Sequence, residues 1–125
     1  MSGPAAETPL TTLNYKIVGT YLKVTPAVVS VPKGIAGSVM VELLNADDSN
    51  NKVDNAIAQG AYVEATLRGA AFPPRRLIGQ VNSPLLLPVL NVVGDYQLDN
   101  IRLADANTGE VRMEPTPNSV PVRGF

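Results

Sequence analysis

The chain of 125 residues contains no cysteine, no histidine and no tryptophan. Without cysteine it forms no disulfide bond and offers no thiolate nucleophile or zinc-thiolate site. Without histidine it lacks the usual general base near neutral pH, the commonest transition-metal ligand and the base of a Ser-His or Cys-His pair. These two absences argue against catalysis, and we expect a protein that is not an enzyme.

Excess charge of one sign and long apolar runs are also scarce. Ten Lys and Arg residues stand against 11 Asp and Glu residues, so the formal net charge is −1 and no strong field attracts nucleic acid or an anionic membrane. The longest apolar stretch, Pro84 to Val93, is interrupted by Pro88 and Asn91, whereas a membrane-spanning helix needs about 20 apolar residues. We therefore expect neither nucleic-acid binding nor membrane insertion.

The remaining composition divides the chain into an arm and one domain. Residues 1–14 are rich in Ser, Gly, Pro, Ala and Thr, which is typical of a flexible N-terminal arm and lacks the regions of a signal peptide. In residues 15–125, short apolar or alternating runs are cut by Pro and Gly every ~8–12 residues, a pattern that predicts an all-β, antiparallel β-sandwich of about seven to nine strands. The expected strands are Tyr15–Val24, Ala27–Val31, Ser38–Leu44, Ala61–Arg68, Arg75–Gly79, Leu85–Leu90, Asp95–Leu103, Glu110–Met113 and Ser119–Arg123.

Two of these runs also predict which faces their side chains occupy. In Ala61–Arg68 the apolar and polar residues alternate, which predicts one buried face and one wet face that includes Glu64. In Asp95–Leu103 the alternation changes phase near Asp99 and Asn100, and we expect a β-bulge there. Only residues 52–60 have helical spacing, so at most one short helical turn is expected.

The stretch "LNVVGDYQL" contains Leu90, Gly94, Tyr96 and Leu98 in the order L-x-x-x-G-x-Y-x-L. This resembles the tyrosine corner with which immunoglobulin-like domains begin their penultimate strand. The following "DNIRLADANTGEV" is similar to the last hairpin of macroglobulin-type, immunoglobulin-like modules in bacterial surface or secreted proteins. The resemblance implies an immunoglobulin-like fold, an extracellular or cell-surface location, and structural roles for Gly94, Tyr96 and Leu98.

Two oxygen-rich loops are candidate calcium sites. In residues 104–110, Asp105, Asn107 and Gly109 have the spacing that begins a calcium loop, but the same residues suit a hairpin turn, which we favour. The loop 45–55 is the first choice for a metal, because carboxylate and amide oxygens are what calcium prefers. Its candidate ligands are Asp47, Asp48, Asn50 and Asp54. A solvated loop has the same composition, and we expect no cofactor other than calcium.

Three further motifs each have an ordinary structural interpretation. The "FPPRR" stretch, residues 72–76, suits a docking surface or, as we favour, an edge strand protected by proline and charge.

A buried lysine beside an asparagine and an acid would permit an isopeptide crosslink, although solvent-facing lysines are the ordinary case. Paired carboxylates would be needed for acid–base catalysis, although acids on the wet face of a strand are expected. The candidates for the crosslink are Lys16 or Lys23 with Asn91 or Asn100, near Glu42. The candidate carboxylate pairs are Asp95 with Asp99 and Glu64 with Glu42.

Two functions remain open at this stage. The first is a non-catalytic structural and assembly module that joins other protein domains or copies of itself and forms a homo-oligomer; the arm and the segment "NSVPVRGF" are strand-competent ends suited to β-augmentation. The alternative is a ligand-binding or calcium-dependent adhesive module that uses loops 45–55 and 104–110.

Overall fold

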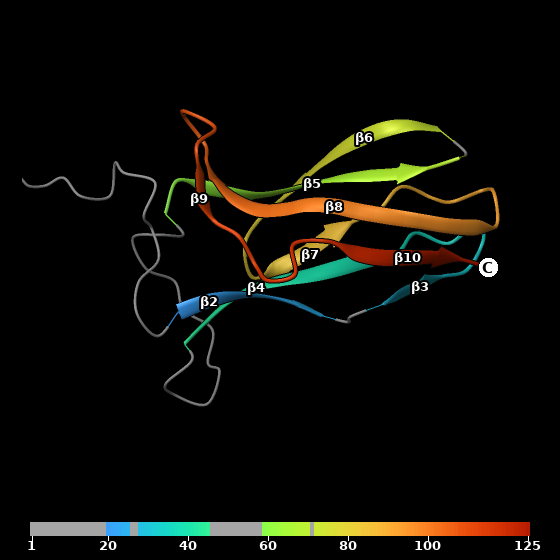
Figure 1. The fold of residues 1–125 in the computed structure, drawn as a ribbon, viewed down its shortest axis with the longest axis horizontal. Helices are drawn as coiled ribbons and strands as arrows, with labels where there is room; N and C mark the ends of the chain where they lie inside the picture. Colours follow the sequence, from blue (N-terminus) through green and yellow to red (C-terminus); the bar gives the residue numbers. More distant parts are fainter. Residues whose placement is uncertain (1–19, 26–27, 46–58, 71) are drawn as a thin grey trace, which may run out of the picture.

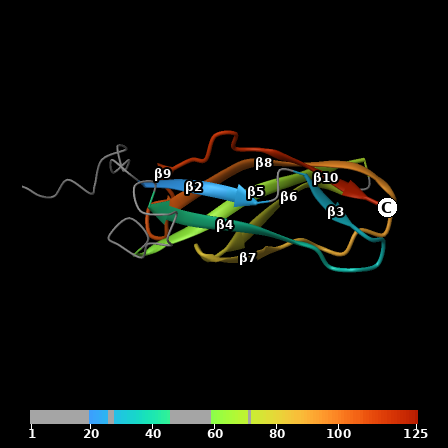
Figure 2. The same ribbon diagram turned by 90° about the horizontal axis from the view of Figure 1, so that it is seen from below.

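The computed structural model describes residues 20–25, 28–45, 59–70 and 72–125. These residues form two sheets packed face to face, so the prediction of an all-β sandwich is confirmed (Figures 1 and 2). The described residues contain no helix, and so they contain none that could cross a membrane. The helical turn expected within residues 52–60 falls almost entirely outside the described residues.

The smaller sheet has the order β2-β4-β7 and the larger has the order β3-β10-β8-β5-β6, with β9 also paired to β8. All described pairs are antiparallel except β3 with β10, which run parallel, a departure from the purely antiparallel sandwich expected. The strands are β2 (Thr20–Thr25), β3 (Val29–Val31), β4 (Ser38–Asn45), β5 (Ala61–Gly69), β6 (Phe72–Gly79), β7 (Ser83–Leu86), β8 (Gly94–Asp105), β9 (Val111–Met113) and β10 (Val120–Gly124).

Most predicted strands lie where the alternation placed them, but two differ clearly in extent. The strand expected at Arg75–Gly79 begins at Phe72. The strand expected at Leu85–Leu90 ends at Leu86, although Leu87 and Leu90 are buried. The amide of Leu87 donates to the carbonyl of Gly37 at 2.9 Å instead of to a strand of the sheet. This apolar run is therefore buried as a loop that covers the core, which apolar composition alone does not distinguish from a strand.

The bulge expected near Asp99 and Asn100 is confirmed. Thr66 of β5 pairs with Asp99 and Glu64 pairs with Arg102, so two residues of β8, Asn100 and Ile101, stand opposite Ala65. Asn100 has φ of 53°, a conformation that asparagine adopts more readily than most residues. The extra residue keeps Ile101, with Leu103 after it, on the buried face that Tyr96 and Leu98 occupy before the bulge.

Tyr96, the residue of the expected tyrosine corner, is 5% exposed and its hydroxyl donates to the carbonyl of Val92 at 2.5 Å. Its ring stacks on Phe72, with the ring centroids 5.8 Å apart. Leu98, two residues along β8, is fully buried. The ring also packs against the backbone of two strands, because a Cβ atom added at Gly69 would overlap it and one at Gly124 would lie 3.2 Å from its Cε1.

We predict that Gly69→Ala lowers the free energy of unfolding by about 1–3 kcal/mol, because the added methyl group must displace the Tyr96 ring in a packed core. Gly124→Ala should cost less, since its new methyl group would meet the ring at a longer distance. Urea denaturation of the two variants measures both values. Equal stability of Gly69→Ala and the wild-type chain would contradict this packing account.

Candidate functional site

The loop after β3, the loop before β8 and the end of β10 lie together at the end of the sandwich that is marked C in Figures 1 and 2. This end carries exposed apolar side chains. Ile35, Val92, Val93 and Phe125, which we call the end cap, are between 54% and 59% exposed. They belong to the loop after β3, the loop before β8 and the residue that follows β10. Large contiguous apolar patches are typical of interaction surfaces, and the backbone hydrogen bonds of this end show that the segments carrying these four residues are neighbours.

Backbone hydrogen bonds hold the segments of the end cap together. The amide of Lys33 donates to the carbonyl of Phe125 at 2.6 Å, and the amide of Phe125 donates to Val31 at 3.0 Å. The amide of Gly34 donates to the carbonyl of Leu90 at 3.1 Å. The end cap is therefore a preformed surface, and little backbone ordering is needed for a partner to bind it.

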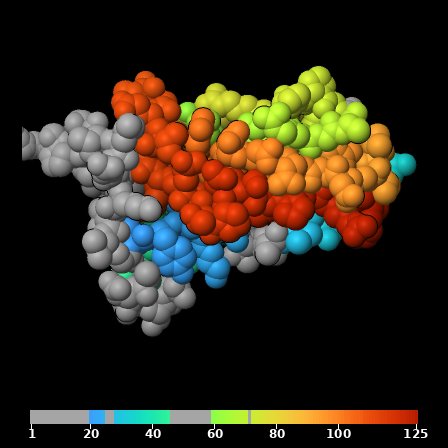
Figure 3. Space-filling model, viewed as in Figure 1, coloured from blue at the N-terminus to red at the C-terminus, as the bar shows by residue number. Residues whose placement is uncertain are grey.

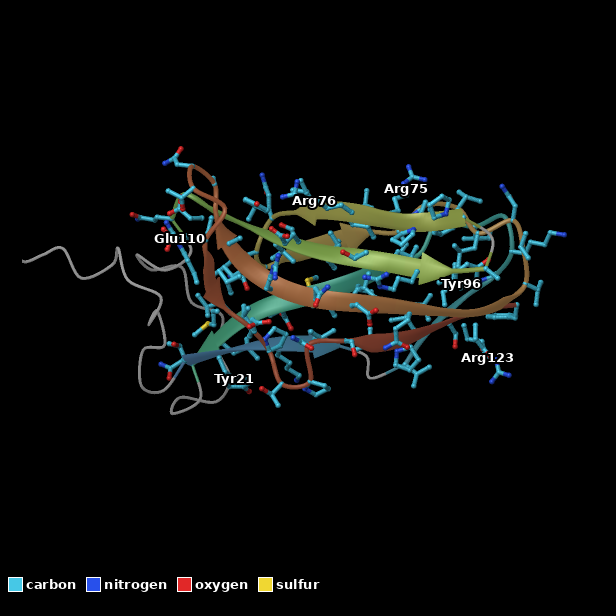
Figure 4. The ribbon with its side chains drawn as sticks, turned by 45° about the horizontal axis from the view of Figure 1, so that its top comes forward. Tyr21, Arg75, Arg76, Tyr96, Glu110 and Arg123 are labelled. Carbon is cyan, nitrogen blue, oxygen red and sulfur yellow. The ribbon has the colours of Figure 1, made fainter. Side chains whose placement is uncertain are left out.

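Charged residues flank this end. Nε of Arg123 lies 3.9 Å from Oδ1 of Asp95, with the two side chains 71% and 88% exposed. Figure 4 shows Arg123 near the same end as Tyr96. The apolar patch thus has exposed charges of both signs at its edge, a distribution common in protein interfaces.

The outer face of the larger sheet contains a buried carboxylate that the sequence pattern placed in solvent. Oε2 of Glu64 lies 3.2 Å from Arg102 on β8 and Oε1 lies 3.4 Å from Arg76 on β6. The Arg76 guanidinium also donates to the Tyr62 hydroxyl at 2.8 Å. Burial raises the pKa of Glu64, but the hydrogen bond with Tyr62 and the charges of Arg102 and Arg76 outweigh it, and the pKa lies below its usual value.

The wet-face prediction is therefore wrong for Glu64, which is 9% exposed. Long arginine side chains on the neighbouring strands cover it. The register between strands brings these arginines beside Glu64, and the alternation within one strand does not reveal that register. The structure makes this carboxylate a structural link across β6, β5 and β8. Figure 4 shows Arg76 and Arg75 on β6, at the outer edge of the same sheet.

The loop 104–110 is a hairpin turn, as favoured from the sequence. Oδ1 of Asp105 accepts hydrogen bonds from the amides of Asn107 at 2.8 Å and Thr108 at 3.0 Å, and Gly109 has φ of 76°. Oδ2 of Asp105 accepts from Arg112 at 2.5 Å. The hydrogen bond from Arg112, followed by those from the two amides, lowers the pKa of Asp105 to about 2. Its carboxylate is thus already engaged by donors and a cation.

Arg112 also fastens this hairpin to the segment before β5. Its guanidinium donates to the carbonyl of Gln59 at 2.6 Å, and the amide of Ala106 donates to the carbonyl of Gly60 at 2.8 Å. The cluster around Asp105 therefore joins two chain segments that meet at one end of the sandwich.

The loop proposed for calcium lies largely outside the described residues. Asn45 ends β4, and Asp47, Asp48, Asn50 and Asp54 all fall within residues 46–58, so their arrangement stays a prediction. Within the part of the chain that the structure describes, no three His, Cys, Asp or Glu residues group in a way that could hold a metal ion.

The FPPRR stretch and the candidate Lys-Asn crosslink have ordinary structural places. The "FPPRR" residues begin β6, which is bonded to β5 and lies at the edge of the larger sheet among the described strands, in agreement with the favoured interpretation. Lys23 is exposed on the smaller sheet and Asn100 is exposed on the larger one, so no buried Lys-Asn pair forms between them. Lys16 lies outside the described residues.

The two carboxylate pairs considered for catalysis do not form acid–base dyads. Asp99 pairs with Arg68 at 3.0 Å and Asp95 with Arg123, while Glu64 and Glu42 belong to different sheets.

Asn82 is a structural residue that the sequence analysis did not single out. It has φ of 61°, and its Oδ1 accepts from the amide of Leu43 at 2.9 Å while its own amide donates to Val41 at 3.0 Å. It thereby fixes the turn between β6 and β7 against β4. Its position in "QVNSP", where two strands are joined by a short turn, was the available signal.

Comparison with known proteins adds no family to this description. No family model, no curated protein and no solved structure matches the chain.

We predict that Glu64→Gln lowers the free energy of unfolding by about 1–3 kcal/mol, because Arg102 and Arg76 lose their shared counter-ion in a largely buried position. Chemical denaturation measures the loss. The matched variant Asp99→Asn breaks a pair whose arginine is 50% exposed, and it should cost less than about 1 kcal/mol. Equal losses for the two variants would contradict the special role of Glu64.

The lowered pKa of Asp105 predicts that the free energy of unfolding falls in acid. Because its pKa is lowered from 3.8 to about 2 in the folded state, the unfolded chain binds the proton more tightly, and this contribution to stability is present above pH ~4 and is lost as the pH falls toward 2. Asp105→Asn should remove that part of the pH dependence in thermal melts recorded between pH 2 and 6. A wild-type slope in the variant would refute the assignment.

The control variant for Asp105→Asn is Asp95→Asn, whose stability is compared with that of the wild-type chain at neutral pH. The Asp95 carboxylate is 88% exposed and its ion pair is long, so the free energy of unfolding should change by no more than a few tenths of a kcal/mol.

Proposed function

We propose that this protein is a non-catalytic structural and assembly module with an immunoglobulin-like fold. Its role is to present surfaces and to join copies of itself or neighbouring domains in an extracellular or cell-surface structure. The location comes from the resemblance of residues 99–111 to the last hairpin of modules in bacterial surface or secreted proteins, and the assembly role is supported by the surface of the described residues.

The strand order supports the immunoglobulin-like part of the proposal. In immunoglobulin domains one sheet contains strands A, B and E, and the facing sheet has the order G, F, C and, in the variable type, C′. The orders β2-β4-β7 and β10-β8-β5-β6 correspond to these two sheets. Tyr96 near the start of β8 occupies the place of the tyrosine corner on strand F, with the expected backbone hydrogen bond.

The end cap is the observation that carries the assembly role. Ile35, Val92, Val93 and Phe125 stay more than half exposed although the sandwich buries a continuous core of Val and Leu between its sheets. Their loops are fixed to one another by backbone hydrogen bonds. Burial of such a surface against a partner contributes about 25 cal/mol for each Å² of apolar area removed from water, from which the entropic cost of association is subtracted.

The charged side chains favour a structural role over a catalytic one. Glu64, Asp99, Asp105 and Asp95 each form an ion pair with an arginine. Catalytic acids and bases are typically set in clefts, in positions where their pKa values approach the working pH. Glu64 and Asp105 instead have pKa values that are shifted downward, away from neutrality.

The alternative of a calcium-dependent adhesive module gains no support from the loop 104–110, where Arg112 and two backbone amides already engage Asp105. Of the loop 45–55 only Asn45 belongs to the described residues, and calcium binding there stays a prediction. The assembly module is therefore the function that we propose.

We predict that the wild-type chain self-associates and that Val93→Asp raises the dissociation constant about tenfold or more, because a charge would be placed in an apolar contact. Light scattering behind a sizing column, over a range of concentrations, measures the mass. The control is Leu86→Asp on β7, where the native leucine is 69% exposed but lies outside the end cap. A wild-type chain that stays monomeric at all concentrations would contradict self-association.

A further inference from the structure

The rim of the end cap carries two opposite charges that belong to neighbouring strands. Arg123 of β10 lies directly across from Asp95 of β8 in the register of the larger sheet, and both side chains are largely exposed. The atoms that come closest, Nε of Arg123 and Oδ1 of Asp95, are 3.9 Å apart. An exposed ion pair of this length contributes little to stability, so either side chain can change its partner at little cost.

Beside this ion pair, three chain segments bring the four apolar side chains of the end cap to one place. Figure 3 shows the cyan surface after β3, the orange surface before β8 and the red surface of β10 side by side at this end. The other large apolar side chains that the described residues expose belong to four different segments: Val28, Ile78, Leu86 and Val89. Covering an apolar surface is most favourable when the covering surface is apolar too. On the described surface of a second copy, the patch that matches the end cap best is therefore the end cap itself.

We propose that the end cap of one copy packs on the end cap of a second copy about a twofold axis, with Arg123 of each copy paired with Asp95 of the other. In such an isologous contact the same patch serves on both sides, and every contact between two different residues occurs twice. The ion pair within each copy is exchanged for two ion pairs between the copies. This proposal rests on the assembly function and names the partner of the end cap and its orientation.

The charges at this end make the patch self-complementary. A surface with charge of one sign would repel its own copy, whereas a cation beside an anion can face the same pair in reverse order. Lys33 adds a further exposed cation to this end, so Asp95 of the second copy meets cations on the opposing surface. Charges at the rim of an interface fix its orientation and exclude wrong partners more than they add affinity.

A contact between the end cap and a different surface of the second copy is the alternative arrangement. It is heterologous, and when repeated it gives a ring or an open filament instead of a closed dimer. In that arrangement Arg123 and Asp95 of one copy do not meet Asp95 and Arg123 of the other. Changes of charge at the two positions therefore distinguish the two arrangements.

The test reverses one charge at a time in the full chain. Arg123→Glu leaves two acids at the rim, and Asp95→Arg leaves two arginines. Each variant alone places like charges together at both ion pairs of the twofold contact, and we expect its dissociation constant to rise about tenfold or more. Sedimentation velocity over a range of concentrations measures this constant. An equimolar mixture of the two variants should associate as tightly as the wild-type chain, because the acidic rim of one then faces the basic rim of the other.

The matched control is Glu110→Arg, which changes the net charge by the same amount as Asp95→Arg. Glu110 is exposed in the 104–110 hairpin, and Figure 4 shows it at the opposite end of the sandwich from Arg123. This variant should associate like the wild-type chain. A loss equal to that of Asp95→Arg would overturn the proposal, because net charge would then explain it. Thermal melts at low concentration check that all variants fold.

The outcomes separate this contact from the assembly function. An oligomer that Val93→Asp weakens, but that neither Arg123→Glu nor Asp95→Arg weakens, retains the assembly function and overturns the twofold contact. Loss in each variant without recovery in the mixture also overturns the twofold contact. A wild-type chain that is monomeric at all concentrations overturns both. Loss in each variant with recovery in the mixture supports both.

Discussion

The pairing of β8 with β5 is the constraint on which the sandwich depends. β8 is the longest described strand and it bonds to β5 on one side and to β10 and β9 on the other. Its two halves can share one buried face only because the bulge opposite Ala65 corrects the alternation. Without that extra residue, the apolar side chains of Ile101 and Leu103 would point to solvent, and the core that joins the two sheets would lose its centre.

The Tyr96 corner and the Glu64 cluster both follow from this pairing. Tyr96 precedes the bulge and fills the space that Gly69 and Gly124 leave open on the two neighbouring strands. Glu64 stands opposite Arg102, just beyond the bulge, where the register of β5 and β8 is restored. One end of the sheet is thus fixed by aromatic packing and its middle by a shared counter-ion, while the loops beyond Tyr96 form the exposed end cap.

Much of the fold could be predicted from local alternation, because a strand with one buried face has a period of two. This was sufficient for β4, β5 and the bulge in β8. It failed where burial has another cause: Leu87 and Leu90 are buried in a loop, and Glu64 is buried under arginines that register brings from other strands. The end cap could not be predicted either, since its residues come from segments that are far apart in the sequence and adjacent only in the fold.

The charged and the apolar side chains on the surface of the sandwich have different roles in this account. Ion pairs hold the larger sheet and the 104–110 hairpin in place, while the end cap stays exposed and is the surface that we propose for a partner. The most direct test is amide hydrogen exchange of the intact chain at low and at high concentration. Our account predicts that the amides of Val92, Val93 and Phe125 become more protected at high concentration, while those of Asn107 and Thr108 do not change. Protection that is independent of concentration at all five positions would contradict self-association through the end cap.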